Sequence, residues 1–284
     1  MSAPAAASDG KRWRDLRKRV LSALVLGPTA IACVWLGATP WTVLMAIAAA
    51  ILTWEWVHLC GLRTRDFPGI AVPLAVLAAG GLAVAGMPQL ALGCLAVGFL
   101  LTWAASRNLP STRRLPLPPL RLALGVLYIG LAGIALIELR HDNEAGRANV
   151  LFLLLAVWAS DIGAYMAGRA FGGPRLMPAV SPNKTWSGAM GGLAMAVVVA
   201  VIAARILAPG DVLSAAPIAA LLSIVAQAGD LLESAIKRHF AVKDTSSLIP
   251  GHGGLLDRLD GVLATAPVAA LLALASGQGS PIWQ

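Results

Sequence analysis

The sequence predicts an all-α, polytopic integral membrane protein with about nine transmembrane helices and a cytoplasmic N-terminus. Of the 284 residues, 58% are hydrophobic and only 13% are charged, whereas soluble domains have roughly 25% charged residues. Apolar stretches of about twenty residues, enough for a helix to cross a bilayer, recur from end to end. The third observation is the uneven distribution of Lys and Arg between the two ends of these stretches.

The apolar stretches give nine candidate spans. Breaks fall at proline-containing segments such as Thr39-Pro40 and Met87-Pro88, because proline restricts the preceding residue and ends helices. The connections around 38–40 and 86–88 are short enough to impose antiparallel hairpins. We expect the spans at about 20–37, 41–60, 70–86, 89–105, 120–137, 149–168, 188–208, 213–232 and 259–278.

Orientation follows from the basic residues. With the N-terminus in the cytoplasm, nineteen of the 22 Lys and Arg residues lie on the cytoplasmic side, and only Arg140, Arg147 and Arg205 lie on the other. This asymmetry is typical of membrane proteins. It explains the net charge of +8 more simply than nucleic-acid binding does. We therefore expect a multi-pass protein of the cell (inner or plasma) membrane, with its charged loops in the cytoplasm.

The chain divides into three parts. Residues 1–19 form a basic cytoplasmic tail that is retained, because no clear cleavage site follows it. Residues 20–148 contain spans one to five. Residues 149–284 contain spans six to nine and the cytoplasmic loop 233–258, where ionisable side chains are concentrated. The three cysteines have no metal-ligand spacing and are interpreted as buried thiols.

Two acidic residues interrupt the apolar background of the spans. We interpret Glu55 as an interfacial residue, because Trp54 and Trp56 flank it and tryptophan favours the membrane interface; a functional role is the alternative. Asp161 lies inside the sixth span, where a carboxylate costs about 2.5–3.5 kcal/mol on insertion scales. It is therefore a functional candidate, with an ion pair to a basic residue such as Arg169 as the structural alternative.

The segment "PAVSPNKTWSG" precedes the seventh span. Ser181 followed by Pro182 is expected to cap a helix. Lys184 and Thr185 would then lie in its first turn, where backbone N–H groups and a cation can hold phosphate. The glycine spacing is not that of a Walker A loop, and a basic interfacial turn accounts for the segment equally well.

The eighth span runs into a polar helical face. Asp230, Glu233, Ser234 and Lys237 are spaced so that they share one side of a helix. A solvated face would explain Glu233 and Lys237, but it explains Asp230 less well, because that carboxylate directly ends an apolar run.

The loop that follows leads into the ninth span through a glycine-rich turn, "IPGHGG", which cannot be regular helix. Asp257 and Asp260 then lie on one face of the next helix, where their repulsion and dehydration would be relieved by a divalent metal. Asp230 and Asp257 are the candidate Mg²⁺ ligands. Arg and Lys residues nearby can neutralise a polyphosphate. Metal-dependent phosphate chemistry is favoured over an ion-coupled transporter and over a purely structural loop.

The same residues resemble a known signature. Ser234-x-Ile236-Lys237-Arg238, Lys243-Asp244, Ser246, Ile249-Pro250, His252-Gly253-Gly254-Leu255 and Asp257-Arg258-Leu259-Asp260 are similar to that of the phosphatidate cytidylyltransferase (CDP-diacylglycerol synthase) family. The upstream segments "SDIGAYMAGRAFG" and "SPNKTWSG" also resemble blocks of that family. The resemblance is sharp from about 155 to 262.

The resemblance implies an all-helical membrane enzyme, commonly dimeric, that condenses CTP with phosphatidic acid to give CDP-diacylglycerol and pyrophosphate. It implies metal ligation by Asp230 and Asp257, with Mg²⁺ and a second, monovalent cation such as K⁺. The catalytic residues that it implies are Lys237, Arg238, Lys243 and Arg258 on the phosphates, Asp244 and Asp260 as further ligands, and His252, which would orient phosphate or shuttle a proton unless it only stabilises the turn. The substrate-binding residues expected are Asp161, Ser181, Lys184, Thr185, Ser234, Gly253 and Gly254.

Two alternatives stay open at the level of the sequence. One is a related enzyme that transfers CMP to, or phosphorylates, another lipid such as a polyprenol. The other is a cation-coupled membrane transporter that uses Asp161, Asp230 and Asp257 as ion sites. A transporter needs carboxylates near the middle of the bilayer with access from both sides, whereas here the charge converges on one face.

Overall fold

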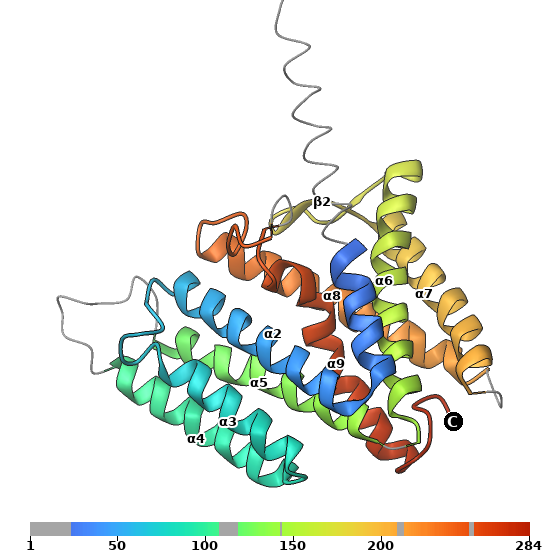
Figure 1. Ribbon diagram of the computed structural model, residues 1–284. Helices are drawn as coiled ribbons and strands as arrows, with labels where there is room; N and C mark the ends of the chain where they lie inside the picture. Colours follow the sequence, from blue (N-terminus) through green and yellow to red (C-terminus); the bar gives the residue numbers. More distant parts are fainter. Residues whose placement is uncertain (1–23, 108–118, 143, 209–212, 250–252) are drawn as a thin grey trace, which may run out of the picture.

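The computed structural model describes residues 24–107, 119–142, 144–208, 213–249 and 253–284. The basic tail predicted over 1–19 and His252 lie outside these residues. The described chain forms nine helices and one short β-hairpin (Figure 1). The first helix is Leu24–Leu36, and the others are α2 (Ala38–Leu59), α3 (Ala71–Val84), α4 (Pro88–Arg107), α5 (Pro119–His141), α6 (Gly146–Phe171), α7 (Trp186–Leu207), α8 (Ala215–His239) and α9 (Leu256–Ser276).

Seven of the described helices are long and apolar enough to cross a membrane. The shortest of them, α4, has 20 residues, and at 1.5 Å per residue it reaches about 30 Å, the thickness of the hydrocarbon core. Leu24–Leu36 and α3 are apolar but shorter. The predicted all-α, polytopic membrane fold with about nine helices is confirmed, although two of the helices are shorter than a full span.

Tight connections set the direction of the first four helices. Gly37, with φ 128°, separates the first helix from α2, and Gly86, with φ 72°, lies between α3 and α4. Glycine adopts these positive values without steric cost, so the two hairpins predicted here are present. The break expected at Thr39-Pro40 is wrong, because α2 already begins at Ala38. Proline is tolerated in a first helical turn, where its missing N–H would have no partner.

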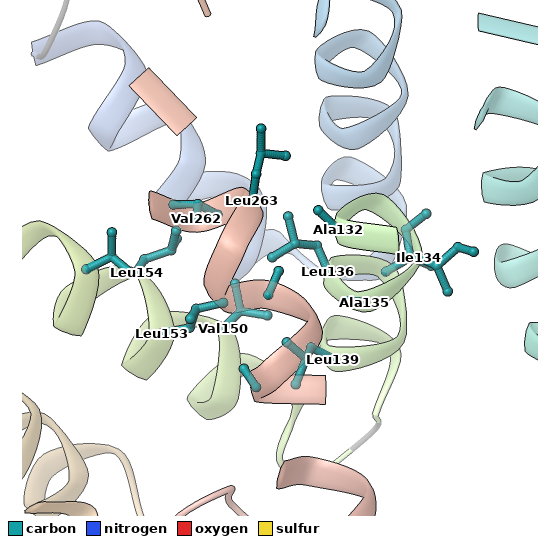
Figure 2. Packing of buried hydrophobic residues seen from close by; sticks show 14 of the residues in the cluster. Ala132, Ile134, Ala135, Leu136, Leu139, Val150, Leu153, Leu154, Val262 and Leu263 are labelled. Carbon is teal, nitrogen blue, oxygen red and sulfur yellow. The ribbon is translucent and has the colours of Figure 1, made fainter. Parts of the chain in front are cut away.

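Helix α5 forms the centre of the bundle. In an apolar 18-residue stretch of α5, 67% of the residues are buried, against 22% in the corresponding stretch of α4. Figure 2 shows its apolar side chains packed against α9, with α6 on the other side of α9. The contact residues are Ala132, Ile134, Ala135, Leu136 and Leu139 of α5, Val150, Leu153 and Leu154 of α6, and Val262 and Leu263 of α9. This core fixes α9 relative to α5 and α6.

Helices α6 and α7 approach each other closely through glycine. A Cβ atom on Gly163 of α6 would lie 2.6 Å from the carbonyl oxygen of Gly191, and one on Gly192 of α7 would lie 2.7 Å from that of Ser160. Small residues at such positions allow membrane helices to pack backbone to backbone. The close packing places Asp161, next to Ser160, near the start of α7.

A β-hairpin joins α6 to α7, in which β1 (Arg175–Met177) pairs antiparallel with β2 (Ser181–Thr185). The prediction that Ser181 caps a helix is therefore wrong, as is the placement of Lys184 and Thr185 in a first helical turn. The cap is Thr185, whose Oγ1 accepts a hydrogen bond from the backbone N of Gly188 at 3.1 Å. Pro182 fits strand as well as helix, because its φ angle is compatible with both.

Candidate active site

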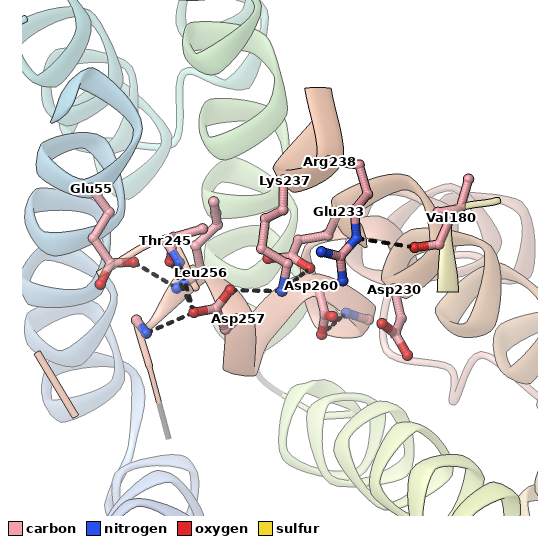
Figure 3. A network of polar contacts seen from close by, with 12 residues as sticks. Glu55, Val180, Asp230, Glu233, Lys237, Arg238, Thr245, Leu256, Asp257 and Asp260 are labelled. Atoms are coloured by element: carbon pink, nitrogen blue, oxygen red, sulfur yellow. Dashed lines mark hydrogen bonds and ion pairs between the residues drawn. The ribbon is translucent and has the colours of Figure 1, made fainter. Parts of the chain in front are cut away.

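Three carboxylates meet between α8 and α9 (Figure 3). Asp230 and Glu233 lie one turn apart on α8, Asp260 faces them from α9, and one oxygen of each lies within 4.8 Å of the others. Gly229 permits this approach, because a Cβ atom there would lie 2.9 Å from the carbonyl oxygen of Asp260. We call these three residues the acidic cluster.

The acidic cluster has the properties of a cation site. Glu233 is only 1% exposed. Its Oε2 forms an ion pair with Lys237 Nζ at 2.7 Å, and Oε1 has no hydrogen-bond partner among the described residues. A buried carboxylate with one oxygen unpaired is costly, and three carboxylates this close repel one another. A divalent cation removes both costs, and carboxylate oxygens are the protein ligands that magnesium prefers. The residues present therefore fit a divalent metal ion.

Asp257, the second metal ligand expected from the sequence, is not one of these three residues, but its carboxylate lies beside that of Glu233. Its Oδ2 accepts hydrogen bonds from Gly254 N at 2.8 Å, Thr245 N at 3.0 Å and Thr245 Oγ1 at 3.1 Å. Its Oδ1 accepts one from Lys237 Nζ at 2.9 Å. Both oxygens thus have donors, and Asp257 orders the loop before α9. Among the described residues, Asp230 has Glu233 and Asp260 as its carboxylate neighbours.

Lys237 connects the two parts of the site. Its Nζ lies 2.7 Å from Glu233 and 2.9 Å from Asp257. The polar face predicted on α8 is present, but the interpretation of Glu233 as part of a solvated face is wrong, because the α8–α9 contact buries this side chain. The spacing of Asp230 and Glu233, one turn apart, was the sequence signal for a shared site.

The β-hairpin brings a second lysine to the acidic cluster. Lys184 Nζ on β2 lies 2.5 Å from Asp230 Oδ2, with side chains 26% and 37% exposed. The Nζ atom itself is buried although the side chain is partly exposed, so the pair offsets part of the negative charge of the acidic cluster. Its position there also suits a cation that meets a phosphate group. Arg238 at the end of α8 donates from Nε to the carbonyl oxygen of Val180 at 3.4 Å, so the hairpin and α8 are joined.

Asp161 also belongs to this end of the bundle. It interacts electrostatically with Asp230, Lys184 and Arg258. No ion pair joins it to Arg169 among the described residues, and the Arg169 guanidinium donates to Tyr165 instead. The structural alternative considered for Asp161 is therefore not present.

A buried polar network lies one turn deeper. Ser160 Oγ and Ser223 Oγ are 2.8 Å apart, and Gln227 Nε2 donates to the carbonyl oxygen of Ala189 at 3.2 Å. This network joins α6, α7 and α8, because Gln227 of α8 also donates to Ser160 of α6 and to Ser223. It holds the helices that carry Asp161 and Asp230 at a fixed separation.

The remaining predicted residues surround the site at its open end. Ser234 is half-buried on the polar face of α8, whereas the side chains of Lys243, Asp244 and Arg258 are exposed. Gly253 has φ 83°, and a Cβ atom there would lie 2.5 Å from Asp257 Oδ2. The turn thus needs glycine for its conformation and for the approach of this carboxylate.

Glu55 is the residue that the sequence interpretation missed. Its side chain is 0% exposed, so the interpretation as an interfacial residue is wrong. Oε1 accepts hydrogen bonds from Ser246 Oγ at 2.6 Å and Leu255 N at 2.8 Å, and Oε2 accepts one from Leu256 N at 2.7 Å. The available signal was the acidic residue itself within an apolar helix.

Comparison with known proteins identifies the family of the chain. Residues 17–275 match the model of the cytidylyltransferase family. A phosphatidate cytidylyltransferase of Brucella suis is 37% identical over 265 residues, covering 90% of this chain and 93% of the relative. Those of Pseudomonas aeruginosa and Bacillus subtilis are 37% and 30% identical, covering 94% and 92% of this chain and 100% and 99% of the relatives. The resemblance seen in the signature is confirmed along most of the sequence, and the chain belongs to the cytidylyltransferase family of nucleotidyltransferase enzymes.

Proposed function

We propose that this protein transfers CMP from CTP to phosphatidic acid, forming CDP-diacylglycerol and pyrophosphate. The observation that carries the proposal is the family relationship over residues 17–275, with relatives named phosphatidate cytidylyltransferase. The acidic cluster supports it, because it lies among Lys184, Lys237 and Arg258 at one end of a membrane bundle. A water-soluble nucleotide and a membrane lipid can both reach such a position.

The acidic cluster is our proposed site for Mg²⁺. Asp230, Glu233 and Asp260 would hold the ion, which when bound supplies positive charge to the phosphates during transfer. We also propose a second, monovalent cation such as K⁺, which is an expectation from the family.

The basic residues around the cluster account for the chemistry that the protein itself supplies. An oxygen of the phosphatidate phosphate forms a bond to the α-phosphorus of CTP. The bond from that phosphorus to the bridging oxygen of the β-phosphate breaks, and its electron pair leaves with pyrophosphate. An anion attacks an anion, so Lys184, Lys237 and Arg258, assisted by Arg238 and Lys243, would bind and neutralise the phosphates. A phosphate monoester, with its second pKa near about 6, is already largely ionised at neutral pH, so no dedicated base is required.

The orientation proposed is that the site faces the cytoplasm from the cell (inner or plasma) membrane. The support is the asymmetry of Lys and Arg, because the three basic residues on the other side, Arg140, Arg147 and Arg205, all lie at the opposite end of the bundle, near the ends of α5 and α7 and the start of α6. We also propose a homodimer, an expectation from the family that sedimentation of the purified protein in detergent would test.

The decisive experiment is an assay of the purified full-length protein in detergent or lipid. With Mg²⁺, CTP and phosphatidic acid, we expect pyrophosphate release and an equimolar lipid product that contains cytidine. Omission of Mg²⁺, or replacement of phosphatidic acid by diacylglycerol, should abolish the release, because the metal site or the attacking phosphate is then missing.

The result also separates the alternatives. Pyrophosphate release with another phospholipid or a polyprenyl phosphate, and none with phosphatidic acid, would reassign the lipid acceptor. A phosphorylated lipid together with CDP would indicate a lipid kinase. A folded sample that performs no nucleotide chemistry with any of these lipids would contradict the proposal and leave the cation-coupled transporter.

A further inference from the structure

The residue at the N-cap position of helix α9 does not cap the helix with its side chain. Its N-cap position is Leu255, which has no side-chain hydrogen bond to the helix. The first N–H groups of a helix have no partner within it. Here the backbone N atoms of Leu255 and Leu256 donate to Glu55, which lies on α2 about 200 residues earlier in the sequence. A carboxylate is favoured at this position, because the N-terminus of a helix carries a partial positive charge.

Glu55 also holds the loop that precedes α9. Ser246 donates to its Oε1 at 2.6 Å. Gly254 packs directly against the carboxylate, since a Cβ atom there would lie 2.6 Å from Oε1 and 2.8 Å from Oε2. Burial of this carboxylate is tolerable because three donors converge on it. The loop and the start of α9 thus close around one side chain.

The groups that Glu55 holds are neighbours of the groups that hold Asp257 (Figure 3). Ser246 follows Thr245, which donates to Asp257 from both its N and its Oγ1. Leu255 and Leu256 follow Gly254, which also donates to Asp257. Asp257 in turn binds Lys237, which is paired with Glu233 of the acidic cluster. A continuous set of polar contacts therefore runs from α2 to the acidic cluster.

We propose that Glu55 is a positioning residue for the transfer reaction: by capping α9 from α2, it fixes the loop that holds Asp257 and the helix that carries Asp260. The inference rests on the proposed function for the reaction that it affects. Glu55 itself does not touch the acidic cluster, and its action is transmitted through the backbone of residues 245–246 and 254–257.

The test compares Glu55→Gln with Glu138→Gln in the full-length protein. Glu138 is the control, because it is a half-buried acid in a membrane helix. It lies near the C-terminal end of α5, at the end of the bundle away from the site. For Glu55→Gln we expect kcat to fall by about tenfold or more. The substitution replaces one carboxylate oxygen, which accepts a hydrogen bond, by an amide NH2 group, which can only donate, and it removes the negative charge. The Mg²⁺ concentration for half-maximal rate should rise, and Glu138→Gln should leave both quantities near wild type.

Hydrogen exchange measured by mass spectrometry provides a readout that is independent of activity. In Glu55→Gln, the peptide that covers 253–257 should exchange about tenfold faster, while peptides from α5 and α6 keep the wild-type rates. Turnover near wild type in Glu55→Gln would overturn the proposal, whether or not the loop exchanges faster. Reduced turnover with unchanged exchange and unchanged Mg²⁺ dependence would also overturn it.

If Glu55→Gln does not accumulate as folded protein, Ser246→Ala carries the test, because it removes one donor and keeps the carboxylate. The same two changes, slower turnover and faster exchange of 253–257, are then expected at smaller size, and their absence would contradict the proposal. Failure of the proposed function gives a different result: the wild-type protein itself would then release no pyrophosphate.

Discussion

Lys237 shows how one side chain organises this site. It is 16% exposed and pairs with two carboxylates whose side chains are each only 2% exposed. Removal of a lysine in this position would leave two buried charges without a counterion, which costs more than the pair contributes. The lysine therefore holds Glu233 and Asp257 close together, so that the acidic cluster and the loop before α9 form one unit.

We expect the loss of a carboxylate from the acidic cluster to lower turnover, and the loss of an exposed carboxylate elsewhere to have no effect. In Asp260→Asn the neutral amide is a poorer metal ligand than the carboxylate, so we expect kcat to fall by about a hundredfold and the Mg²⁺ requirement to rise. Both quantities follow from pyrophosphate release measured over a range of Mg²⁺ concentrations. Asp66→Asn is the control, because Asp66 is exposed in the loop before α3 and should retain wild-type kinetics. An Asp260→Asn enzyme within threefold of wild type would argue against ligation by Asp260.

Single residues were only partly predictable from the sequence. Asp230, Lys184 and Lys237 stood out because each departs from an apolar or helical pattern, and the structure brings all three to one place. The contact between Asp230 and Asp260 could not be derived, because it depends on the register of α9 against α8 at Gly229. Glu55 could not be placed either, because its three donors follow about 200 residues later in the chain.

At the scale of the elements, the loop before α9 is shaped by what packs into it. Gly254 lies against Glu55 and Thr245, and its N donates to Asp257. We expect Gly254→Ala to lower kcat by about tenfold or more, because the added methyl group must displace the Thr245 hydroxyl and the Glu55 carboxylate. Pyrophosphate release under saturating substrates measures this change.

Gly81→Ala is the matched control for this substitution. Gly81 lies within α3, and a Cβ atom there would have nothing within 4 Å. Alanine favours helix over glycine by about 1 kcal/mol, so the control should be at least as stable as wild type and equally active. Equal activity of the two variants would mean that the loop tolerates a side chain at 254, contrary to the close packing seen in the structure.

The elements themselves followed from hydropathy, with exceptions that have local causes. Apolar length predicted the spans because a bilayer imposes one length on every crossing helix. The β-hairpin before α7 was not predicted, since Pro182 and Thr185 are compatible with both a helix start and a strand. Tertiary contacts decide between them: Trp186 N donates to the carbonyl oxygen of Pro174, and Arg238 binds the hairpin from α8.

At the scale of the whole molecule, the fold places all of this chemistry at one end of the bundle. The ends of α2 and α8 and the start of α9 lie there, and the β-hairpin that leads from α6 to α7 reaches toward the end of α8 (Figure 1). Arg140, Arg147 and Arg205 lie at the other end. The proposed orientation can therefore be tested by measuring from which side of the membrane two positions, one at each end of the bundle, can be labelled.

Arg65 and Arg205 are both exposed, Arg65 in the loop after α2 and Arg205 in the last turn of α7. In Arg65→Cys and Arg205→Cys variants, made with Cys33 and Cys94 replaced by Ala, a membrane-impermeant maleimide applied to intact cells should label only position 205. Position 65 should react after the membrane is opened, because it then becomes accessible from the cytoplasmic side. The native Cys60 should stay silent in both conditions: burial raises the pKa of its thiol to about 12 despite the opposing effect of Arg121, and the thiolate is the reactive form. Labelling of position 65 from outside, with position 205 protected, would contradict the proposed orientation. The site would then face away from the cytoplasm and could not use cytoplasmic CTP.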